Sequence, residues 1–120
     1  MKSERFDKKI AEIHKVLGSS FRIRLLYAIG KDEACVCHLE TLLKKRQAYI
    51  SQHLMALRDA GLLKTRREGK YIYYRVAQKE LFGLLDWSAQ IGGLDQAQLE
   101  DLSKKQEVWP QVQSMVRMED

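Results

Sequence analysis

The sequence predicts one mainly α-helical domain that carries a small β-hairpin. Its 120 residues are 45% hydrophobic and 31% charged, which suffices for a single hydrophobic core. Apolar residues recur at helical spacing along most of the chain. Only residues 62–76 change to an alternation of β-branched, aromatic and basic residues. Seven glycines and one proline exclude a collagen-like, low-complexity or largely disordered chain.

Two helices are expected before the first polar turn. The first carries apolar residues at steps of four, three and four, and Gly18 ends it. Ser19 can cap the second helix by accepting a hydrogen bond from a first-turn amide, and Gly30 closes that helix. The apolar positions are Phe6, Ile10, Ile13 and Leu17 in the first helix, and Ile23, Leu26, Tyr27 and Ile29 in the second.

Two more helices follow the polar turn at residues 31–33. A short helix is expected around residues 36–45 and a longer one over residues 47–60, which Gly61 ends. Each has an apolar stripe that would face the core. The stripes consist of Leu39, Leu42 and Leu43 in the short helix, and of Ile50, Leu54 and Leu57 in the longer one.

A β-hairpin is expected next, with its turn at Glu68-Gly69. Because successive strand residues point to opposite faces, the pattern predicts a two-stranded ribbon with one face on the core and one face free. Ile72, Tyr74 and Val76 share one face, and Tyr71, Tyr73 and Arg75 share the other.

The helical period returns from Lys79 to Ile91, and the pair Gly92-Gly93 ends this last helix. Helices followed by a hairpin with a basic tip form a winged helix-turn-helix, which we expect over residues 1–93. Residues 94–120 are acidic and weakly periodic, and they are predicted to form a C-terminal helical extension.

Positive charge is concentrated in the middle of the chain. The net charge is +5, made up of +2 over residues 1–43, +8 over residues 44–79 and −5 over residues 80–120. Such an asymmetry favours a polyanion-binding surface on the fourth helix and the hairpin.

The N-terminal segment has no apolar signal core, and no run of about 18 apolar residues occurs. We therefore expect a cytoplasmic protein with no membrane segment. Two cysteines separated by one residue do not make a disulfide framework.

Four segments of the chain resemble the ArsR/SmtB metalloregulatory repressors, which are winged helix-turn-helix proteins. Residues 17–26 resemble the family's opening of the second helix, and residues 34–39, Ala-Cys-Val-Cys-His-Leu, resemble its metal-sensing segment. Residues 47–63 resemble the recognition helix and residues 67–76 resemble the wing. The resemblance runs from about Phe6 to Ile91.

The resemblance implies a homodimeric repressor that binds a pseudo-palindromic operator in double-stranded DNA, with one recognition helix in each half-site. The first helix and the helix from Lys79 onward would supply the dimer interface. Such a protein is not an enzyme. Cys37 and His38 diverge by about 100° on one helix, which aims them poorly as nucleophile and base.

A recognition helix presents short polar side chains to base edges near its N-terminus, and the hairpin supplies cations for phosphates. With its apolar stripe facing the core, the fourth helix leaves polar residues on its outer face. His53 is expected to hold this helix by a hydrogen bond or to contact phosphate. The candidate DNA-binding residues are Gln47, Ala48, Tyr49, Ser51, Gln52, His53, Arg58, Arg66, Arg67 and Lys70.

By resemblance, Cys35 and Cys37 are ligands of a metal or metalloid ion that acts as the inducer. Thiolates select soft or borderline ions, and a helix N-terminus lowers a thiol's pKa. As(III) and Sb(III) are favoured, because As(III) tolerates two thiolates plus hydroxide. Cd(II), Pb(II), Zn(II) and Cu(I) remain possible.

The sequence limits how such a site is completed. The chain has no third cysteine, so three sulfur ligands cannot come from one protomer. Water, His38, Glu40 or the partner subunit could complete the site. Residues 80–120 contain no His and no Cys, which sets aside the last-helix sites of zinc and nickel sensors. The alternative is a repressor of the same fold whose thiols respond to oxidants or reactive sulfur.

Overall fold

The computed structural model describes residues 2–95, 97, 98 and 101, with side chains described from residue 5 onward. Over these residues it contains five helices and one three-stranded antiparallel sheet, which confirms the predicted winged helix-turn-helix. The elements are α1 (Lys2–Leu17), α2 (Ser20–Ile29), β1 (Glu33–Cys35), α3 (Val36–Leu43), α4 (Gln47–Asp59), β2 (Leu63–Glu68), β3 (Tyr71–Val76) and α5 (Glu80–Ile91).

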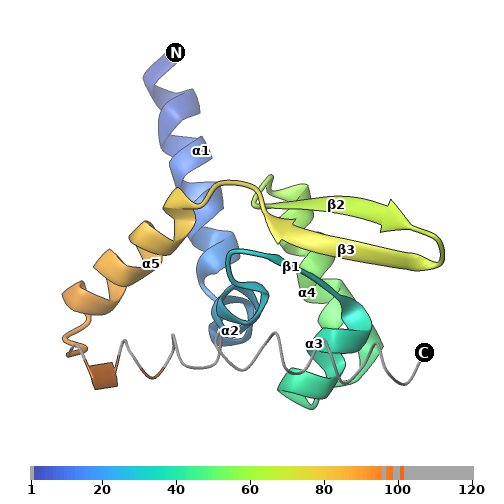
Figure 1. Cartoon of the computed structure of the whole chain (residues 1–120). Coiled ribbons are helices and arrows are strands. Elements are labelled where there is room, and N and C mark those ends of the chain that lie inside the picture. The colour runs from blue at the N-terminus through green and yellow to red at the C-terminus, as the bar shows by residue number, and fades with distance from the viewer. Residues whose placement is uncertain (1, 96, 99–100, 102–120) are drawn as a thin grey trace.

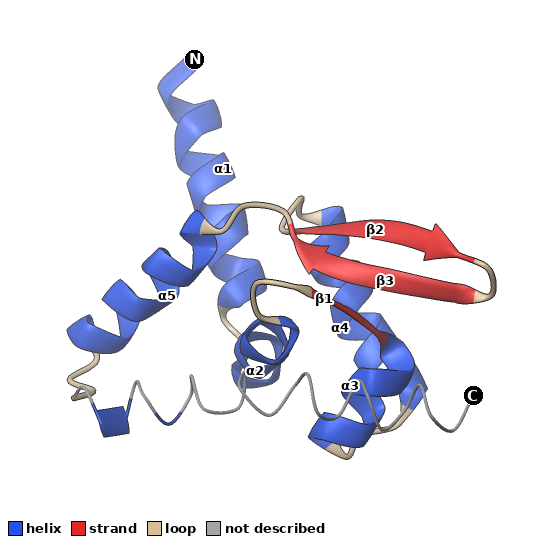
Figure 2. Ribbon diagram, in the orientation of Figure 1, coloured by secondary structure: helices blue, strands red, loops and turns tan. Residues whose placement is uncertain are grey.

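The helix α2 lies in the middle of the molecule, with other elements on either side of it (Figure 1). The helices α1 and α5 lie on one side, while α3, α4 and the sheet lie on the other. The hairpin of β2 and β3 projects away from α1 and α5 as a long ribbon, drawn in red in Figure 2. None of the helices among the described residues is both apolar enough and long enough to span a membrane.

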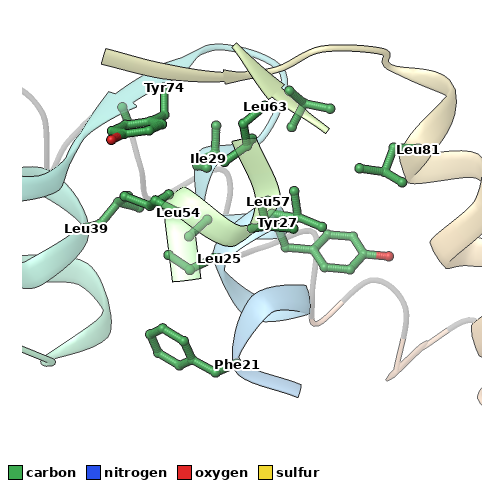
Figure 3. Packing of buried hydrophobic residues seen from close by; sticks show 14 of the residues in the cluster. Phe21, Leu25, Tyr27, Ile29, Leu39, Leu54, Leu57, Leu63, Tyr74 and Leu81 are labelled. Carbon is green, nitrogen blue, oxygen red and sulfur yellow. The ribbon is translucent and has the colours of Figure 1, made fainter. Parts of the chain in front are cut away.

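The core lies where α2, α3 and α4 meet (Figure 3). Ile50, Leu54 and Leu57, the predicted inner stripe of α4, have no exposed surface. They pack with Leu25 of α2 and Leu39 of α3 in one hydrophobic cluster. Burial of side chains of this size stabilises a fold by about 1.5–3 kcal/mol each, so the core holds α4 firmly by one face.

The predicted ends of α2 are confirmed. The Oγ atom of Ser19 accepts a hydrogen bond from the Arg22 amide at 3.3 Å. Gly30 ends the helix with a φ of 66°, a left-handed conformation that glycine adopts without steric cost.

The strand β1 is the main departure from the sequence prediction. Residues 33–35 were expected to pass from a polar turn directly into a helix, and the hairpin was expected to be two-stranded. Instead, β1 pairs antiparallel with β3, with Cys35 opposite Tyr73, so β3 is the central strand. A strand of three residues is too short to show an alternating pattern, and only its pairing with β3 defines it.

The hairpin differs in detail from the prediction near its tip. Its turn lies at Gly69 and Lys70, one residue later than expected, and Gly69 has a φ of 60°. Tyr74 and Val76 are buried as predicted, but Ile72 is 42% exposed. The prediction for Ile72 was wrong because the ribbon extends past the core before it turns.

The predicted extension over residues 94–120 lies mostly outside the described residues. At its beginning, the Asp95 carboxylate accepts from the Gln98 amide and the Gln98 side chain accepts from the Asp95 amide, each at 2.9 Å. This reciprocal pair is a capping box, which starts a helical turn.

Candidate functional site

The outer face of α4 presents the polar residues predicted for DNA contact. Gln47, Ala48 and Gln52 are exposed, and Ser51 is half-buried. The ring of Tyr49 packs between neighbours, with its centroid 4.8 Å from the centroid of Phe21 and 4.8 Å from that of His53. Tyr49 is 42% exposed, so it combines a packing contact with an accessible edge.

His53 makes the structural hydrogen bond expected of it. Arg22 of α2 donates from Nε to Nδ1 of His53 at 3.0 Å, and it donates from Nη1 to the Val16 carbonyl at 3.1 Å. Burial and then the positive charge of Arg22 lower the pKa of His53 below its usual value of 6.5. A neutral ring that accepts at Nδ1 carries its proton on Nε2. His53 therefore links α4 to α2 and to the end of α1.

Arg66 forms hydrogen bonds to carboxylates of the same chain, which the sequence did not indicate. Its Nε and Nη2 atoms donate to the carboxylate of Glu33 in β1, and Nη1 donates to Glu68 at 2.9 Å. The guanidinium carbon also lies 4.7 Å from the ring centroid of Tyr73. These hydrogen bonds raise the pKa of Arg66. Two carboxylates thus offset a cation that was expected to face phosphate.

The other predicted phosphate-binding residues remain at the surface. Arg67 donates from Nε to the carbonyl of Gly69 at 3.4 Å, and Lys70 lies with Nζ 5.2 Å from the ring centroid of Tyr71. Arg58 forms an exposed ion pair with Asp59 at 3.2 Å. Exposed pairs of this kind contribute little to stability, so these three cations can turn to a polyanion at small cost.

Cys35 and Cys37 lie where β1 runs into α3. Cys35 is the last residue of β1 and the N-cap of α3, with 3% of its surface exposed, and Cys37 is half-buried in the first turn. Their Cα atoms are 5.5 Å apart, and a disulfide joins their sulfur atoms. Thiol–disulfide exchange interconverts the dithiol and disulfide states of such a pair.

His38 adds a nitrogen donor to the cysteine pair. It is 2% exposed, and its Nδ1 atom accepts from the Cys35 amide at 3.5 Å. One donor atom each from Cys35, Cys37 and His38 lie within 4.8 Å of one another. Two sulfurs and one imidazole nitrogen form a donor set that suits soft and borderline ions, so these residues fit a thiophilic ion when the cysteines are reduced.

A cavity of about 350 Å³ lies between the cysteine pair, α4 and the wing, the elements predicted to contact DNA. Cys35 and Cys37 line one part of it, and Gln47 and Ser51 of α4 line another. Lys70 and Tyr71 line it from the tip of the wing. The two cysteines therefore share one cavity with residues that were predicted to contact DNA.

The bacterial regulatory protein family named arsR matches residues 19–65 of the chain. This range covers α2, β1, α3, α4 and the start of β2. The matched range therefore includes both the cysteine pair and α4, the helix predicted to contact bases.

Three curated relatives show the range of similar proteins. The arsenical resistance operon repressor of Escherichia coli is 35% identical over 81 residues, which cover 67% of this chain and 66% of that protein. A cadmium resistance regulatory protein CadC homolog of Staphylococcus aureus is 30% identical over 78 residues, 64% of each chain. The chain thus spans slightly less than two thirds of their length. An uncharacterized HTH-type transcriptional regulator of Methanocaldococcus jannaschii, MJ1325, is 37% identical over 83 residues, which cover 66% of this chain and 93% of that protein.

Solved structures share the fold. One is a homodimeric winged helix-turn-helix DNA-binding domain from Mycobacterium bovis, described as a possible ArsR-family transcriptional regulator. It has a TM-score of 0.69 and 28% identity, and the match covers 77% of this chain and 87% of that one.

Proposed function

Since the chain belongs to the arsR family of bacterial regulatory proteins, we propose that it is a homodimeric repressor that leaves its DNA operator when Cys35 and Cys37 bind a thiophilic ion. The observation that carries this proposal is the single cavity shared by the two cysteines, the N-terminal turns of α4 and the wing tip. The family consists of transcriptional regulators, and the chain is not an enzyme.

The proposed DNA surface consists of the start of α4 and the wing. Gln47, Ala48, Tyr49, Ser51 and Gln52 would reach base edges in the major groove, and Arg58, Arg67 and Lys70 would contact phosphates. His53 would act through its hydrogen bond with Arg22, which orients α4. Arg66 would reach phosphate only when it leaves the carboxylate of Glu33.

The proposed dimer interface uses the apolar side chains that α1 and α5 leave exposed. Phe6 and Ile10 of α1 are 65% and 58% exposed, and Trp87 and Ile91 of α5 are 66% and 85% exposed. Large apolar residues gathered on two helices of a small domain are typical of an interaction surface. The homodimeric neighbour from Mycobacterium bovis supports a second copy of this chain as the partner.

The proposed release mechanism starts at the first turn of α3. In the dithiol state, the two sulfurs lie at a helix N-terminus, where the backbone dipole favours thiolates. A bound ion would supply the positive charge that holds both thiolates together. Cys35 also belongs to β1, so any shift of its backbone acts on β3 through the Cys35–Tyr73 pair. The other end of α3 leads through Lys44, which has a φ of 55°, into α4.

Coupling between two such sites is typically about 1–3 kcal/mol, which corresponds to about 5- to 150-fold in operator affinity. As(III) and Sb(III) are the favoured inducers, because two thiolates and a hydroxide suffice for As(III). Cd(II), Pb(II), Zn(II) and Cu(I) are the alternatives. The names of an arsenic-resistance relative and a cadmium-resistance relative support an ion of this chemical class.

The test begins with an operator selected from a random duplex library by the reduced protein. Fluorescence anisotropy then measures operator affinity for the wild type and for Cys35→Ser/Cys37→Ser, with added arsenite, Cd(II) or Zn(II). We expect at least one ion to weaken binding by the wild type and none to act on the double variant. Retention of the operator by the wild type with all three ions would exclude arsenite, Cd(II) and Zn(II) as inducers.

The disulfide between Cys35 and Cys37 favours a second candidate function, in which oxidation or reactive sulfur is the signal. In this case operator affinity would depend on the redox state of the pair without any ion. Mass spectrometry after mild oxidation, combined with anisotropy on the same sample, would identify the modified cysteines. Equal operator affinity in the oxidised and reduced protein would exclude this candidate.

A further inference from the structure

The guanidinium of Arg22 joins three helices. Arg22 lies on α2, and its Nε atom donates to Nδ1 of His53 on α4 at 3.0 Å. Its Nη1 atom donates to the carbonyl of Val16, in the last turn of α1, at 3.1 Å. The last four carbonyls of a helix have no partner within that helix, and a cation beside them is favoured by the helix dipole. Arg22 therefore binds the end of α1 and the side of α4 at the same time.

The start of α2 holds the backbone of Arg22 in place. Ser19 is the N-cap of this helix, and its Oγ atom accepts from the Arg22 amide at 3.3 Å. The preceding residue, Phe21, is 7% exposed, and its ring centroid lies 4.8 Å from that of Tyr49 and 5.1 Å from that of His53. The Arg22 side chain thus starts from an anchored backbone, and its planar guanidinium gives each N–H a fixed direction.

The helices that Arg22 joins carry two different proposed surfaces. Figure 1 shows α2 between α1 on one side and α4 on the other. The exposed Phe6 and Ile10 of α1 belong to the proposed dimer interface, and α4 carries the proposed base contacts. In a dimer with twofold symmetry, the angle between α1 and α4 within each protomer determines how far apart the two recognition helices lie. The two half-sites of an operator must have a matching separation.

We infer that Arg22 is a positioning residue, which holds α1 and α4 at one angle and thereby sets the half-site spacing of the operator. This inference rests on the proposed function, because it requires a dimer and an operator with two half-sites. Arg22 contacts no base in this role. It determines which spacing the protein prefers among operators with identical half-sites.

The test uses the operator selected by the reduced protein, with its spacer lengthened or shortened by about one to three base pairs, and a duplex with a single half-site. Fluorescence anisotropy measures the affinity of the reduced full chain for each duplex. The variant Arg22→Gln has a side chain too short to reach both acceptors. Arg24→Gln is the matched control, because it removes the same charge from an exposed position of α2, where the guanidinium carbon lies 6.0 Å from the ring centroid of Phe21.

The wild type and Arg24→Gln should both prefer one spacing. In Arg22→Gln, affinity for the preferred operator should fall by about 10-fold, the effect of losing charge-assisted hydrogen bonds, and the other spacings should bind about equally well. Its affinity for the single half-site should equal that of Arg24→Gln. An equal loss on the single half-site and on the operator would overturn the inference, because Arg22 would then act within one half-site, as a phosphate contact does. A retained spacing preference would overturn it as well.

Two further variants separate the hydrogen bonds from charge and from ring packing. Arg22→Lys keeps the charge but lacks the planar fork, and His53→Phe keeps a ring beside Tyr49 but has no acceptor. Both should relax the spacing preference, and urea denaturation checks that each variant is folded under the assay conditions. A wild-type preference in both variants would overturn the inference.

Failure of the proposed function has a different signature. A monomeric wild type, or one that binds a single half-site as tightly as the operator, would overturn the homodimeric repressor. A dimeric wild type that prefers one spacing, together with an Arg22→Gln variant that shares this preference, would overturn only the role of Arg22.

Discussion

Individual side chains determine how much positive charge the protein can offer to DNA. Arg66 illustrates this, because Glu33 binds it through two nitrogens and Glu68 binds a third. The cluster of these three residues carries a net charge of −1 although it lies on the basic wing. Glu33 also sits two residues before Cys35, so the ion pair links the cysteine-bearing strand to the wing.

We expect Glu33→Gln to free Arg66 for a phosphate contact. Operator binding at low salt should tighten, and the slope of log K against log salt should steepen by about 0.9, the contribution of one additional neutralised phosphate. Anisotropy titrations over a series of salt concentrations measure both quantities. Asp59→Asn is the control, because Arg58 is already proposed to contact phosphate and its exposed pair with Asp59 is weak, so the slope should not change. An unchanged slope in Glu33→Gln would show that the pair with Glu33 is not what keeps Arg66 from DNA.

His53 should make the stability of the protein depend on pH. Its pKa in the folded chain lies below the usual 6.5, so the folded state favours the neutral ring more than the unfolded state does. The stabilisation is complete above pH 6.5 and is lost as the pH falls from there through the lowered pKa. Protonation also removes the acceptor of Arg22 and places two positive charges side by side.

Urea denaturation of the wild type should therefore show that the free energy of unfolding decreases as the pH is lowered from 7.5 to 5. This range spans the ordinary histidine pKa of about 6.5. In His53→Gln, whose side chain can still accept from Arg22 but does not titrate, this part of the decrease should be absent. Identical pH profiles for the two proteins would contradict the assignment. His14→Gln is the control for a histidine outside this contact.

At the scale of elements, α4 packs on the core through one apolar face, and its other face is the one proposed to contact DNA. We expect Leu54→Ala to lower the free energy of unfolding by about 2–5 kcal/mol, because it removes fully buried methyl groups and leaves a cavity. Met55→Ala, the neighbouring residue at 48% exposure, should change stability by no more than about 0.5 kcal/mol. Urea denaturation measures both, and equal losses would show that α4 does not pack as described.

The pairing of β1 with β3 joins the cysteine segment to the wing at the same scale. Because Cys35 is at once the last residue of β1 and the N-cap of α3, the sheet and the helix-turn-helix meet at one residue. A local change there has two routes to the proposed DNA surface, one through β3 and one through α3 into α4.

At the scale of the whole molecule, the exposed apolar residues of α1 and α5 predict how two copies meet. We expect Ile10→Glu/Ile91→Glu to be monomeric by analytical ultracentrifugation at concentrations where the wild type is a dimer. Its operator affinity should fall, since two linked half-sites bind more tightly than one. Ile72→Glu places the same charge on an exposed apolar residue of the wing and should stay dimeric. A dimeric double variant would place the interface elsewhere.

Much of the fold could be predicted from residue spacing. The stripe of Ile50, Leu54 and Leu57, the Ser19 cap and the Gly30 end were all correct, because each depends on local geometry within a few residues. The exposure of Ile72 was not predictable in this way, since it depends on how far the ribbon extends beyond the core. The Cys-x-Cys pair was evident in the sequence, but the position of His38 beside both sulfurs depended on α3 starting at Val36.

The sequence by itself determined the five helices and the hairpin of this protein, the basic middle third and the presence of two thiols ahead of a helix-turn-helix, because periodicity, capping and charge are properties of neighbouring residues. Only the tertiary structure decided that β1 joins the wing, that Glu33 binds Arg66, and that one cavity touches the cysteines, α4 and the wing tip. Each of these three features joins residues at least ten positions apart in the sequence, and such arrangements depend on how the elements pack and not on any local pattern.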